Sequence, residues 1–266
     1  MTVKAILFDL DDTLLWDERS VREAFERTCQ AASQHYPQLN PVELEDLVRS
    51  EARKLYESYE TIAFTKMIGI NPFEGLWGNF TSGQLEEFRA LQKLAPAYRK
   101  DAWTNGLKAA GIEDAELGAK LAEQFPQERR QLSYVYEETF EVLKKLKESY
   151  SLLLLTNGSP DLQQEKLDGV PELVSFFDHI LISGNFGRGK PDPSIFYHAL
   201  GLLNIQPQEG VMVGDKLTTD IKGANSVGIT SVWINRHELS RDGEIVPRYE
   251  IRHLTDLYPI IDDLNA

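Results

Sequence analysis

The chain has 266 residues, of which 42% are hydrophobic, so it can bury one large core or a core with a smaller satellite. Its formal net charge of −14 argues against nucleic acid as a partner, because no run of Lys and Arg is available to displace counterions. No apolar stretch approaches the ~20 residues that span a bilayer, and no signal peptide precedes the first strand-like run, so we expect a cytoplasmic, soluble protein without a membrane partner.

The first predicted strand, at residues 4–8, delivers two carboxylates, Asp9 and Asp11, into a turn. Side chains two residues apart on an extended segment lie on the same side. At about 4 Å and an effective dielectric of about 20, two like charges cost roughly 4 kcal/mol. A divalent cation between them would turn that cost into a binding site. The alternative is a helix N-cap, because Asp and Thr are also good capping residues.

Residues 17–134 show apolar side chains at helical spacing without intervening strands. We interpret this segment as an inserted bundle of four or five helices. It predicts two domains, an α/β core formed by residues 1–16 and 135–266 and a helical domain at 17–134. The single cysteine, Cys29, excludes an internal disulfide and lies on an apolar helical face, which predicts a core residue.

Strand-like runs alternate with helical stretches along the core segments, at residues 4–8, 152–155, 180–183, 211–213 and 231–234. This alternation predicts an α/β fold, a doubly wound (Rossmann-like) parallel sheet with helices on both faces. Helix starts are expected at Pro160 and Pro193, and helix ends at Gly169, Gly201 and Gly228. The polar residues 235–248 predict a surface loop.

Polar residues follow three more of the predicted strands. Thr156 and Asn157 follow the second strand, Lys190 lies in a Gly- and Pro-rich loop after the third, and Asp215 and Asp220 follow the fourth. In such sheets ligands bind beyond the carboxyl ends of the strands, so we expect the four clusters to meet in one crevice. Taken singly, each has an ordinary interpretation, namely a buried Thr, a solvated Lys or a capped turn.

Together these residues resemble the haloacid dehalogenase (HAD) superfamily of phosphohydrolases, whose motifs are an Asp-x-Asp-x-Thr, a Thr or Ser, a Lys, and a Gly-Asp followed by a further Asp, in that order. The resemblance covers residues 2–16 and 136–261, and it implies that residues 17–134 form the helical cap of that family. The last third is similar to the branch of pyrimidine nucleotidases and N-acylneuraminate-9-phosphate phosphatases. Lys216 departs from the pattern, because small polar residues are common at this position.

The resemblance implies a phosphoric monoester hydrolase. Asp9 would be the nucleophile that takes the phosphoryl group, and Asp11 would protonate the leaving alcohol and later deprotonate the attacking water. Asp11 then needs a raised pKa, which repulsion from Asp9 and Asp215 could supply. Lys190 would pair with Asp9 and with a phosphate oxygen.

The expected cofactor is Mg²⁺, because a hard cation prefers carboxylate, carbonyl and water oxygens. Its implied ligands are the Asp9 carboxylate, the Asp11 backbone carbonyl and Asp215, with Asp220 as a supporting residue. The Thr156 hydroxyl and the Asn157 backbone N–H, together with Lys190, would bind the phosphate.

The expected partner is a small-molecule phosphate ester, with nucleoside monophosphates, sugar phosphates and phosphoserine as candidates. The alternatives are a phosphosugar mutase of the same fold and a catalytically degenerate binding or regulatory module. Asp11 argues against a dehalogenase, which has no use for a second carboxylate there. We expect a monomer or a weak homodimer.

Within the helical segment, Arg129 and Arg130 could supply positive charge, although a solvated helical face is the favoured interpretation. Candidate specificity residues are Asp17, Glu18, Arg19 and the aromatic-rich segment 73–80.

Overall fold

The protein is described by a computed structural model that covers residues 2–241 and 243–266. The chain divides into two compact units. The α/β unit consists of Met1–Trp16, Val135–Gly158 and Val170–Ala266, and the helical unit consists of Asp17–Tyr134 and Ser159–Gly169. Among the described residues, no helix combines the length and the apolar character that a membrane span requires.

The α/β unit holds a six-stranded sheet in the order β3-β2-β1-β4-β5-β6, in which every neighbouring pair is parallel. The strands are β1 (Ala5–Phe8), β2 (Ser151–Thr156), β3 (His179–Ile182), β4 (Gly210–Gly214), β5 (Thr230–Ile234) and β6 (Tyr249–Ile251). The five predicted strands are confirmed, with no end shifted by more than one residue. The edge strand β6 was not predicted.

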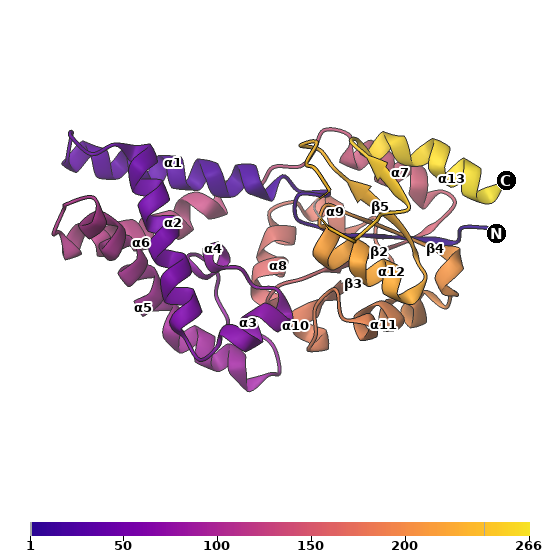
Figure 1. Cartoon of the computed structure of the whole chain (residues 1–266), viewed down its shortest axis with the longest axis horizontal. Coiled ribbons are helices and arrows are strands. Elements are labelled where there is room, and N and C mark those ends of the chain that lie inside the picture. The colour runs from indigo at the N-terminus through magenta and orange to yellow at the C-terminus, as the bar shows by residue number, and fades with distance from the viewer. Residues whose placement is uncertain (1, 242) are drawn as a thin grey trace. The chain divides into compact units, whose positions relative to one another are not determined.

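Helices cover both faces of this sheet (Figure 1). They are α7 (Thr139–Lys147), α9 (Pro171–Val174), α10 (Ser183–Phe186), α11 (Pro193–Leu203), α12 (Lys222–Val227) and α13 (Leu257–Asn265), with the shorter turns η1 (Pro207–Glu209), η2 (Leu217–Ile221) and η3 (Leu254–Asp256). On one face, Leu7, Leu153 and Met212 of the sheet form a buried cluster with Phe196 of α11 and Ala224 of α12. The α/β fold predicted from the sequence is thereby confirmed.

The two helix starts predicted in the core segments are each set by a capping side chain followed by proline. The Ser159 side chain accepts from the backbone N–H of Leu162, and the Asp192 side chain accepts from Ser194 N–H at 2.9 Å. Pro160 and Pro193 then occupy the first helical position, where the missing N–H costs nothing. The predicted starts are confirmed.

The predicted helix ends are confirmed at two of three glycines. Gly169 follows the last residue of α8 (Pro160–Asp168), and Gly228 follows α12 with a φ of 80°. The predicted end at Gly201 is wrong, because α11 continues to Leu203. Asn204, at a φ of 52°, takes the left-handed position there. Asn is the residue other than glycine that adopts this conformation most readily.

The helical unit contains four long helices, α1 (Asp17–His35), α2 (Pro41–Ser58), α5 (Glu86–Ala109) and α6 (Ala115–Arg130), with the short α3 (Ile62–Ile68) and α4 (Pro72–Gly75) and with α8. Its core is aromatic, since the rings of Phe25, Trp103 and Phe125 lie within 6 Å of one another. Cys29 belongs to this core and is fully buried, as predicted, and burial raises the pKa of its thiol.

Helix α8 groups with the helical unit, whereas the predicted domain boundaries place residues 159–169 in the α/β core. The physical reason lies in its side chains. Leu162 is part of the apolar core of the helical unit, and the buried Lys166 ammonium lies 2.9 Å from the Glu74 carboxylate of α4.

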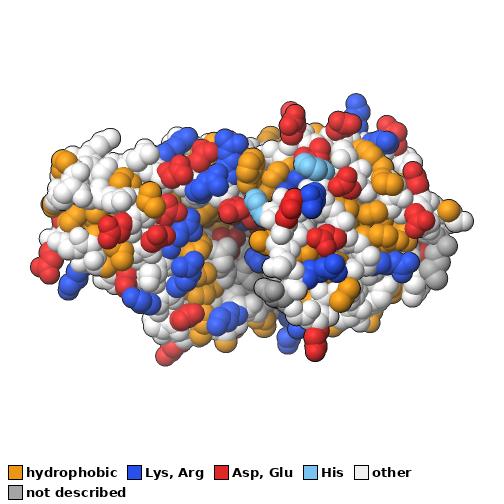
Figure 2. All heavy atoms as spheres, turned by 45° about the horizontal axis from the view of Figure 1, so that its top comes forward, with side chains coloured by type: hydrophobic (Ala, Val, Ile, Leu, Met, Phe, Trp, Pro, Cys, Tyr) orange, Lys and Arg blue, Asp and Glu red, His pale blue; other side chains and the backbone are white. Residues whose placement is uncertain are grey.

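On the face drawn in Figure 2, Lys and Arg side chains are interspersed with Asp and Glu. A surface of this kind favours solubility and offers no broad basic area on that face.

Candidate active site

The candidate site lies where the strand order of the α/β unit reverses. From β1 the chain proceeds through β2 and β3 to one edge of the sheet, and through β4, β5 and β6 to the other. Asp9 follows β1, and its backbone N–H donates to the Val213 carbonyl of β4 at 2.9 Å. Asp215 follows β4. The two carboxylates therefore stand at the carboxyl ends of adjacent strands at the switch point, where such sheets bind ligands.

Lys190 reaches this point from the loop that follows α10. Its ammonium group lies 2.6 Å from Asp9 Oδ1, 2.7 Å from Asp220 Oδ1 and 2.7 Å from the Leu155 carbonyl at the end of β2. The Lys190 side chain is 2% exposed. All three ammonium protons thus have an acceptor, which is the condition under which a buried lysine stays charged.

Burial and neighbouring charges shift the pKa values of Lys190, Asp9 and Asp215. Burial lowers the pKa of Lys190, but the carboxylates of Asp220 and Asp9 outweigh burial and raise it above its usual range. Burial raises the pKa of Asp9, against the opposing effect of the Lys190 ammonium. The pKa of Asp215 is raised well above its usual value, first by burial and then by the negative charge of Asp9 and Asp220.

Asp9, Asp215 and Asp220 each offer one carboxylate oxygen, and these three oxygens lie within 4.8 Å of one another. One ammonium group faces these three carboxylates, so the cluster carries an excess of negative charge in the interior. Burial first, and then this excess of negative charge, raise the pKa of Asp215. A divalent cation held by carboxylate oxygens would remove it, and the donor set fits the oxygen preference of Mg²⁺.

The turn between β4 and η2 holds the Asp220 carboxylate in place. The Asp220 carboxylate accepts the Lys216 backbone N–H at 3.0 Å, and the residue is fully buried. Gly214 is required there, because a Cβ at this position would lie 2.4 Å from the Asp220 carboxyl carbon. Lys216 itself is exposed.

Asp11 lies in the turn after Asp9 and is half-buried. Its neighbour Asp12 has a φ of 56°, a left-handed conformation that a residue with a side chain adopts at some cost. The Asp11 carboxylate is not among the three whose oxygens converge in the described part of the chain. Its expected metal contact is the backbone carbonyl, so this position is compatible with the prediction.

Thr156 and Asn157 lie at the end of β2, next to the Lys190 loop. Thr156 is fully buried. The Asn157 side chain makes two hydrogen bonds with the Lys190 backbone: Nδ2 donates to the carbonyl at 2.9 Å, and Oδ1 accepts from the N–H at 2.8 Å. This clamp on the loop was not predicted, because the sequence analysis considered only the Asn157 backbone. The signal in the sequence was an Asn just after a predicted strand, because its side-chain amide can both donate and accept hydrogen bonds.

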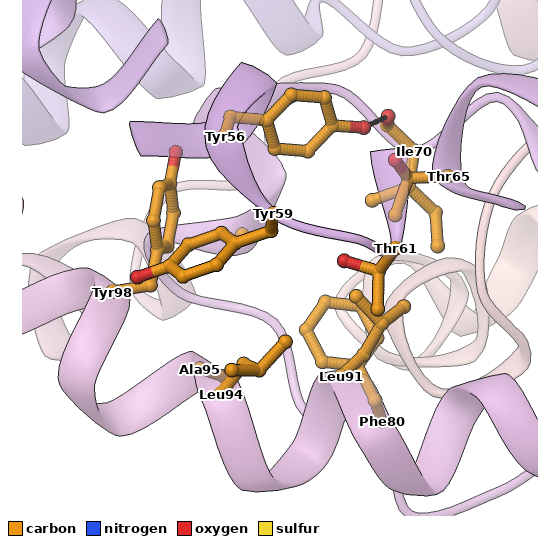
Figure 3. Close-up of a pocket in the computed structure, with 11 residues that line it drawn as sticks. Tyr56, Tyr59, Thr61, Thr65, Ile70, Phe80, Leu91, Leu94, Ala95 and Tyr98 are labelled. Atoms are coloured by element: carbon orange, nitrogen blue, oxygen red, sulfur yellow. Dashed lines mark hydrogen bonds between the residues drawn. The ribbon is translucent and has the colours of Figure 1, made fainter. Parts of the chain in front are cut away.

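A cavity in the helical unit is the competing location for a ligand site (Figure 3). It is lined by aromatic and aliphatic side chains, among them Tyr56, Tyr59 and Tyr98. The Tyr56 hydroxyl donates to the Ile70 carbonyl, and the Tyr98 hydroxyl donates to the Pro72 carbonyl at 2.7 Å. Its volume of about 30 Å³ has room for about two water molecules. The described residues that line it include no Lys, Arg or His, so the cavity offers no cation to a phosphate group.

The helical unit also contains a buried group of charged side chains. Arg129 is 4% exposed and pairs with Asp17, while Lys166 pairs with Glu74 and lies 3.8 Å from Asp17. The interpretation of Arg129 as part of a solvated face is wrong. Four alternating charges compensate one another, so their burial is sustained by pairing.

The geometry can be compared with known proteins. A family model described as haloacid dehalogenase-like hydrolase matches residues 3–228. The phosphoserine phosphatase of Thermus thermophilus is 34% identical over 259 residues, which cover 96% of this chain and 98% of that protein. The N-acylneuraminate-9-phosphatase of Mus musculus is 35% identical over 164 residues, which cover 58% of this chain and 66% of that protein.

Among solved structures, the HAD-hydrolase YfnB from Bacillus subtilis, bound to magnesium, has a TM-score of 0.68 and 21% identity, covering 98% of this chain and 100% of that one. This likeness concerns the fold. The family model extends over most of the chain and includes every residue of the cluster around Lys190. The chain belongs to the haloacid dehalogenase-like hydrolases.

Proposed function

We propose that the protein is a Mg²⁺-dependent phosphatase that hydrolyses a small-molecule phosphate monoester through an aspartyl-phosphate intermediate. The observation that carries the proposal is the Lys190 ammonium between Asp9 and Asp220, with Asp215 oxygens close enough to share a cation. The relatives reported above support the reaction class, because both are named as phosphatases.

Asp9 is the proposed nucleophile. Its carboxylate oxygen forms a bond to phosphorus while the bond from phosphorus to the ester oxygen breaks. The Lys190 ammonium, 2.6 Å from Asp9 Oδ1, favours the ionised form of this carboxylate against the effect of burial and orients it. The same charge stabilises the negative oxygens of the transferring phosphoryl group.

Asp11 is the proposed acid and base. Its carboxyl proton passes to the ester oxygen as the alcohol leaves, and its carboxylate then takes a proton from the water that attacks the acyl phosphate. Thr156 and the Asn157 N–H are proposed to hold the phosphate. The clamp of Asn157 on the Lys190 backbone adds a positioning role.

Asp9, the Asp11 carbonyl and Asp215 are proposed to hold Mg²⁺, which supplies charge neutralisation of the phosphate when it is bound. Asp220 is proposed to support the site by sharing Lys190 with Asp9. The convergence of three carboxylates supports this assignment.

Phosphoserine is the first substrate to test, because a relative that is 34% identical over nearly the full length is named for it. Sugar phosphates and nucleoside monophosphates follow. Relatives named for glyceraldehyde 3-phosphate and for a phosphoribitylamino-uracil support a range of small leaving groups in this family.

Release of phosphate from p-nitrophenyl phosphate with Mg²⁺ tests the proposal. We expect turnover by the natural chain, its loss in Asp9→Asn, and normal turnover in the matched control Asp192→Asn, which keeps a capping side chain at the start of α11. No release from this ester or from a panel of phosphorylated metabolites would favour a binding module. Transfer of the phosphoryl group between sugar positions without net release would favour a mutase.

A further inference from the structure

The turn that carries Asp11 is held at its far end by a side chain outside the motifs. After Asp9 the backbone passes through the left-handed Asp12 and closes, with the Leu14 and Leu15 N–H groups both donating to the Leu10 carbonyl. A residue at positive φ costs of order 1 kcal/mol and persists when its surroundings fix it. The aim of the Asp11 carboxyl therefore depends on what fixes this turn.

Arg236, in the loop after β5, is one of the groups that fix it. Its guanidinium donates to the Thr13 carbonyl at 2.9 Å, two residues after Asp11. The neighbouring Leu14 carbonyl accepts from the Tyr136 N–H at 3.2 Å and from the Thr139 hydroxyl at 3.1 Å. These groups hold the two consecutive carbonyls at the end of the turn.

The Arg236 guanidinium is itself held from two further directions. It pairs with the Glu138 carboxylate at 2.8 Å and lies 3.5 Å from the centre of the Tyr136 ring, which stacks on Trp16 at 5.3 Å. The Arg236 side chain is 9% exposed. Only a planar guanidinium can stack on a ring while donating to a carboxylate and a carbonyl at once.

We propose that Arg236 is a positioning residue that aims the Asp11 carboxyl at the leaving-group oxygen. This inference rests on the proposed phosphatase function. Arg236 acts through the Thr13 carbonyl and the turn, and the Glu138 pair and the Tyr136 ring fix the guanidinium in place.

If Arg236 aims Asp11, the loss of kcat/KM in an Arg236 variant should depend on the leaving group of the ester. An alkyl oxygen leaves as a strongly basic alkoxide unless Asp11 delivers its proton while the bond to phosphorus breaks. A p-nitrophenolate oxygen is weakly basic and leaves with little help. Since kcat/KM reports the steps up to departure of the first product, a misaimed Asp11 lowers it more for an alkyl ester than for an aryl ester.

The experiment compares kcat/KM for phosphoserine and for p-nitrophenyl phosphate in the natural chain, Arg236→Ala and Arg236→Lys. We expect Arg236→Ala to lose about tenfold or more in excess on phosphoserine, within the range of general acid catalysis. Arg236→Lys should show most of the same excess loss on phosphoserine, because one ammonium group cannot replace both the two-pronged donation and the ring stacking of a guanidinium. The matched control is Arg241→Ala, in the same loop, whose exposed pair with Glu250 should leave both values unchanged.

An equal loss on both esters in Arg236→Ala would overturn the proposal, because a general structural defect lowers both. If Arg236→Ala does not fold, Glu138→Gln serves instead, with a smaller excess loss on the alkyl ester expected and an unchanged ratio contradicting the proposal. If the natural chain hydrolyses another alkyl phosphate but not phosphoserine, that ester takes its place. Absence of all phosphate release from the natural chain would instead reject the proposed function, and this inference with it.

Discussion

The ammonium group of Lys190 has three acceptors at 2.6–2.7 Å, and two of them are carboxylates from opposite ends of the chain. Asp220 is fully buried, and the Asp9 side chain is 12% exposed. Two anions in this setting are tolerated because the cation between them is equally buried. The residue assigned to catalysis thus also balances the charge of the native state.

Lys190→Met keeps an unbranched side chain that is one atom shorter and removes its charge. Two buried carboxylates then lose their cation, so we expect the free energy of unfolding in EDTA to fall by about 3–5 kcal/mol, and phosphate release to be lost. Urea denaturation followed by circular dichroism measures the stability.

The double variant Lys190→Met with Asp220→Asn leaves one fewer buried carboxylate. It should recover part of the stability lost in the single variant and none of the activity. If Lys190→Met is as stable as the natural chain, the Lys190 charge does not stabilise the fold, and the account of charge balance is contradicted.

Glu138 provides a prediction on pH. Burial raises its pKa and is the largest single influence, but the hydrogen bond and the charge of Arg236 and the backbone N–H groups of Glu138 and Leu254 together outweigh burial, so its pKa lies below the usual value. A carboxyl whose pKa is lowered by folding contributes stability above its unfolded pKa, and that contribution is lost as the pH falls through its folded pKa.

Glu138→Gln should therefore lower the free energy of unfolding by about 1–2 kcal/mol at neutral pH, and the difference from the natural chain should shrink as the pH falls through the lowered pKa of folded Glu138. Urea denaturation at a series of pH values measures this difference. A difference that stays constant or grows on acidification would contradict the account.

At the scale of elements, the strands that carry the site were predictable because the sheet is covered on both faces. A strand covered on both faces reads as an uninterrupted apolar run, and β1, β2 and β4 do so. The edge strand β6 has three residues, of which only Ile251 is buried. Such a strand has no apolar run, so the sequence carried no signal for it.

The grouping of α8 with the helical unit was not predictable for a different reason. Its start at Pro160 follows from local capping chemistry. Its packing depends on the pairing of Lys166 with Glu74, which is 92 residues away along the chain. Spacing and composition do not report which distant partner a charged side chain meets.

Two helical glycines give a matched test of the packing on the sheet. A Cβ at Gly201 of α11 would meet nothing within 4 Å, whereas at Gly223 of α12 it would lie 2.1 Å from the Phe196 ring. We expect Gly201→Ala to raise the free energy of unfolding by about 0.5–1 kcal/mol and Gly223→Ala to lower it by about 1–3 kcal/mol. Thermal and urea denaturation measure both, and a change of the same sign in the two variants would contradict the described packing.

For the whole molecule, the sequence could predict the fold class and the strand ends that carry polar clusters. Parallel strands bring their carboxyl ends to one edge, which is why Asp9, Lys190 and Asp215 could be grouped in advance. The clamp of Asn157 and the contact of Arg236 with the turn could not be predicted. Both depend on side-chain directions within loops, for which no periodicity exists.

The whole chain, like the site, carries more negative than positive charge, with a formal net charge of −14. A phosphate ester is an anion and approaches such a protein against repulsion, so local positive charge decides binding. Lys190 supplies one charge, and the proposed Mg²⁺ would supply two more. Removal of divalent cations by EDTA should therefore abolish phosphate release, and added Mg²⁺ should restore it.

The most direct test of the account is to trap the covalent intermediate on Asp9. The protein is mixed with Mg²⁺ and a substrate it turns over, quenched in acid during turnover, digested and examined by mass spectrometry. The account predicts a phosphoryl adduct on the peptide that contains Asp9, which disappears when substrate is exhausted and is absent from Asp9→Asn. Turnover without an adduct there, or an adduct that persists in Asp9→Asn, would contradict it.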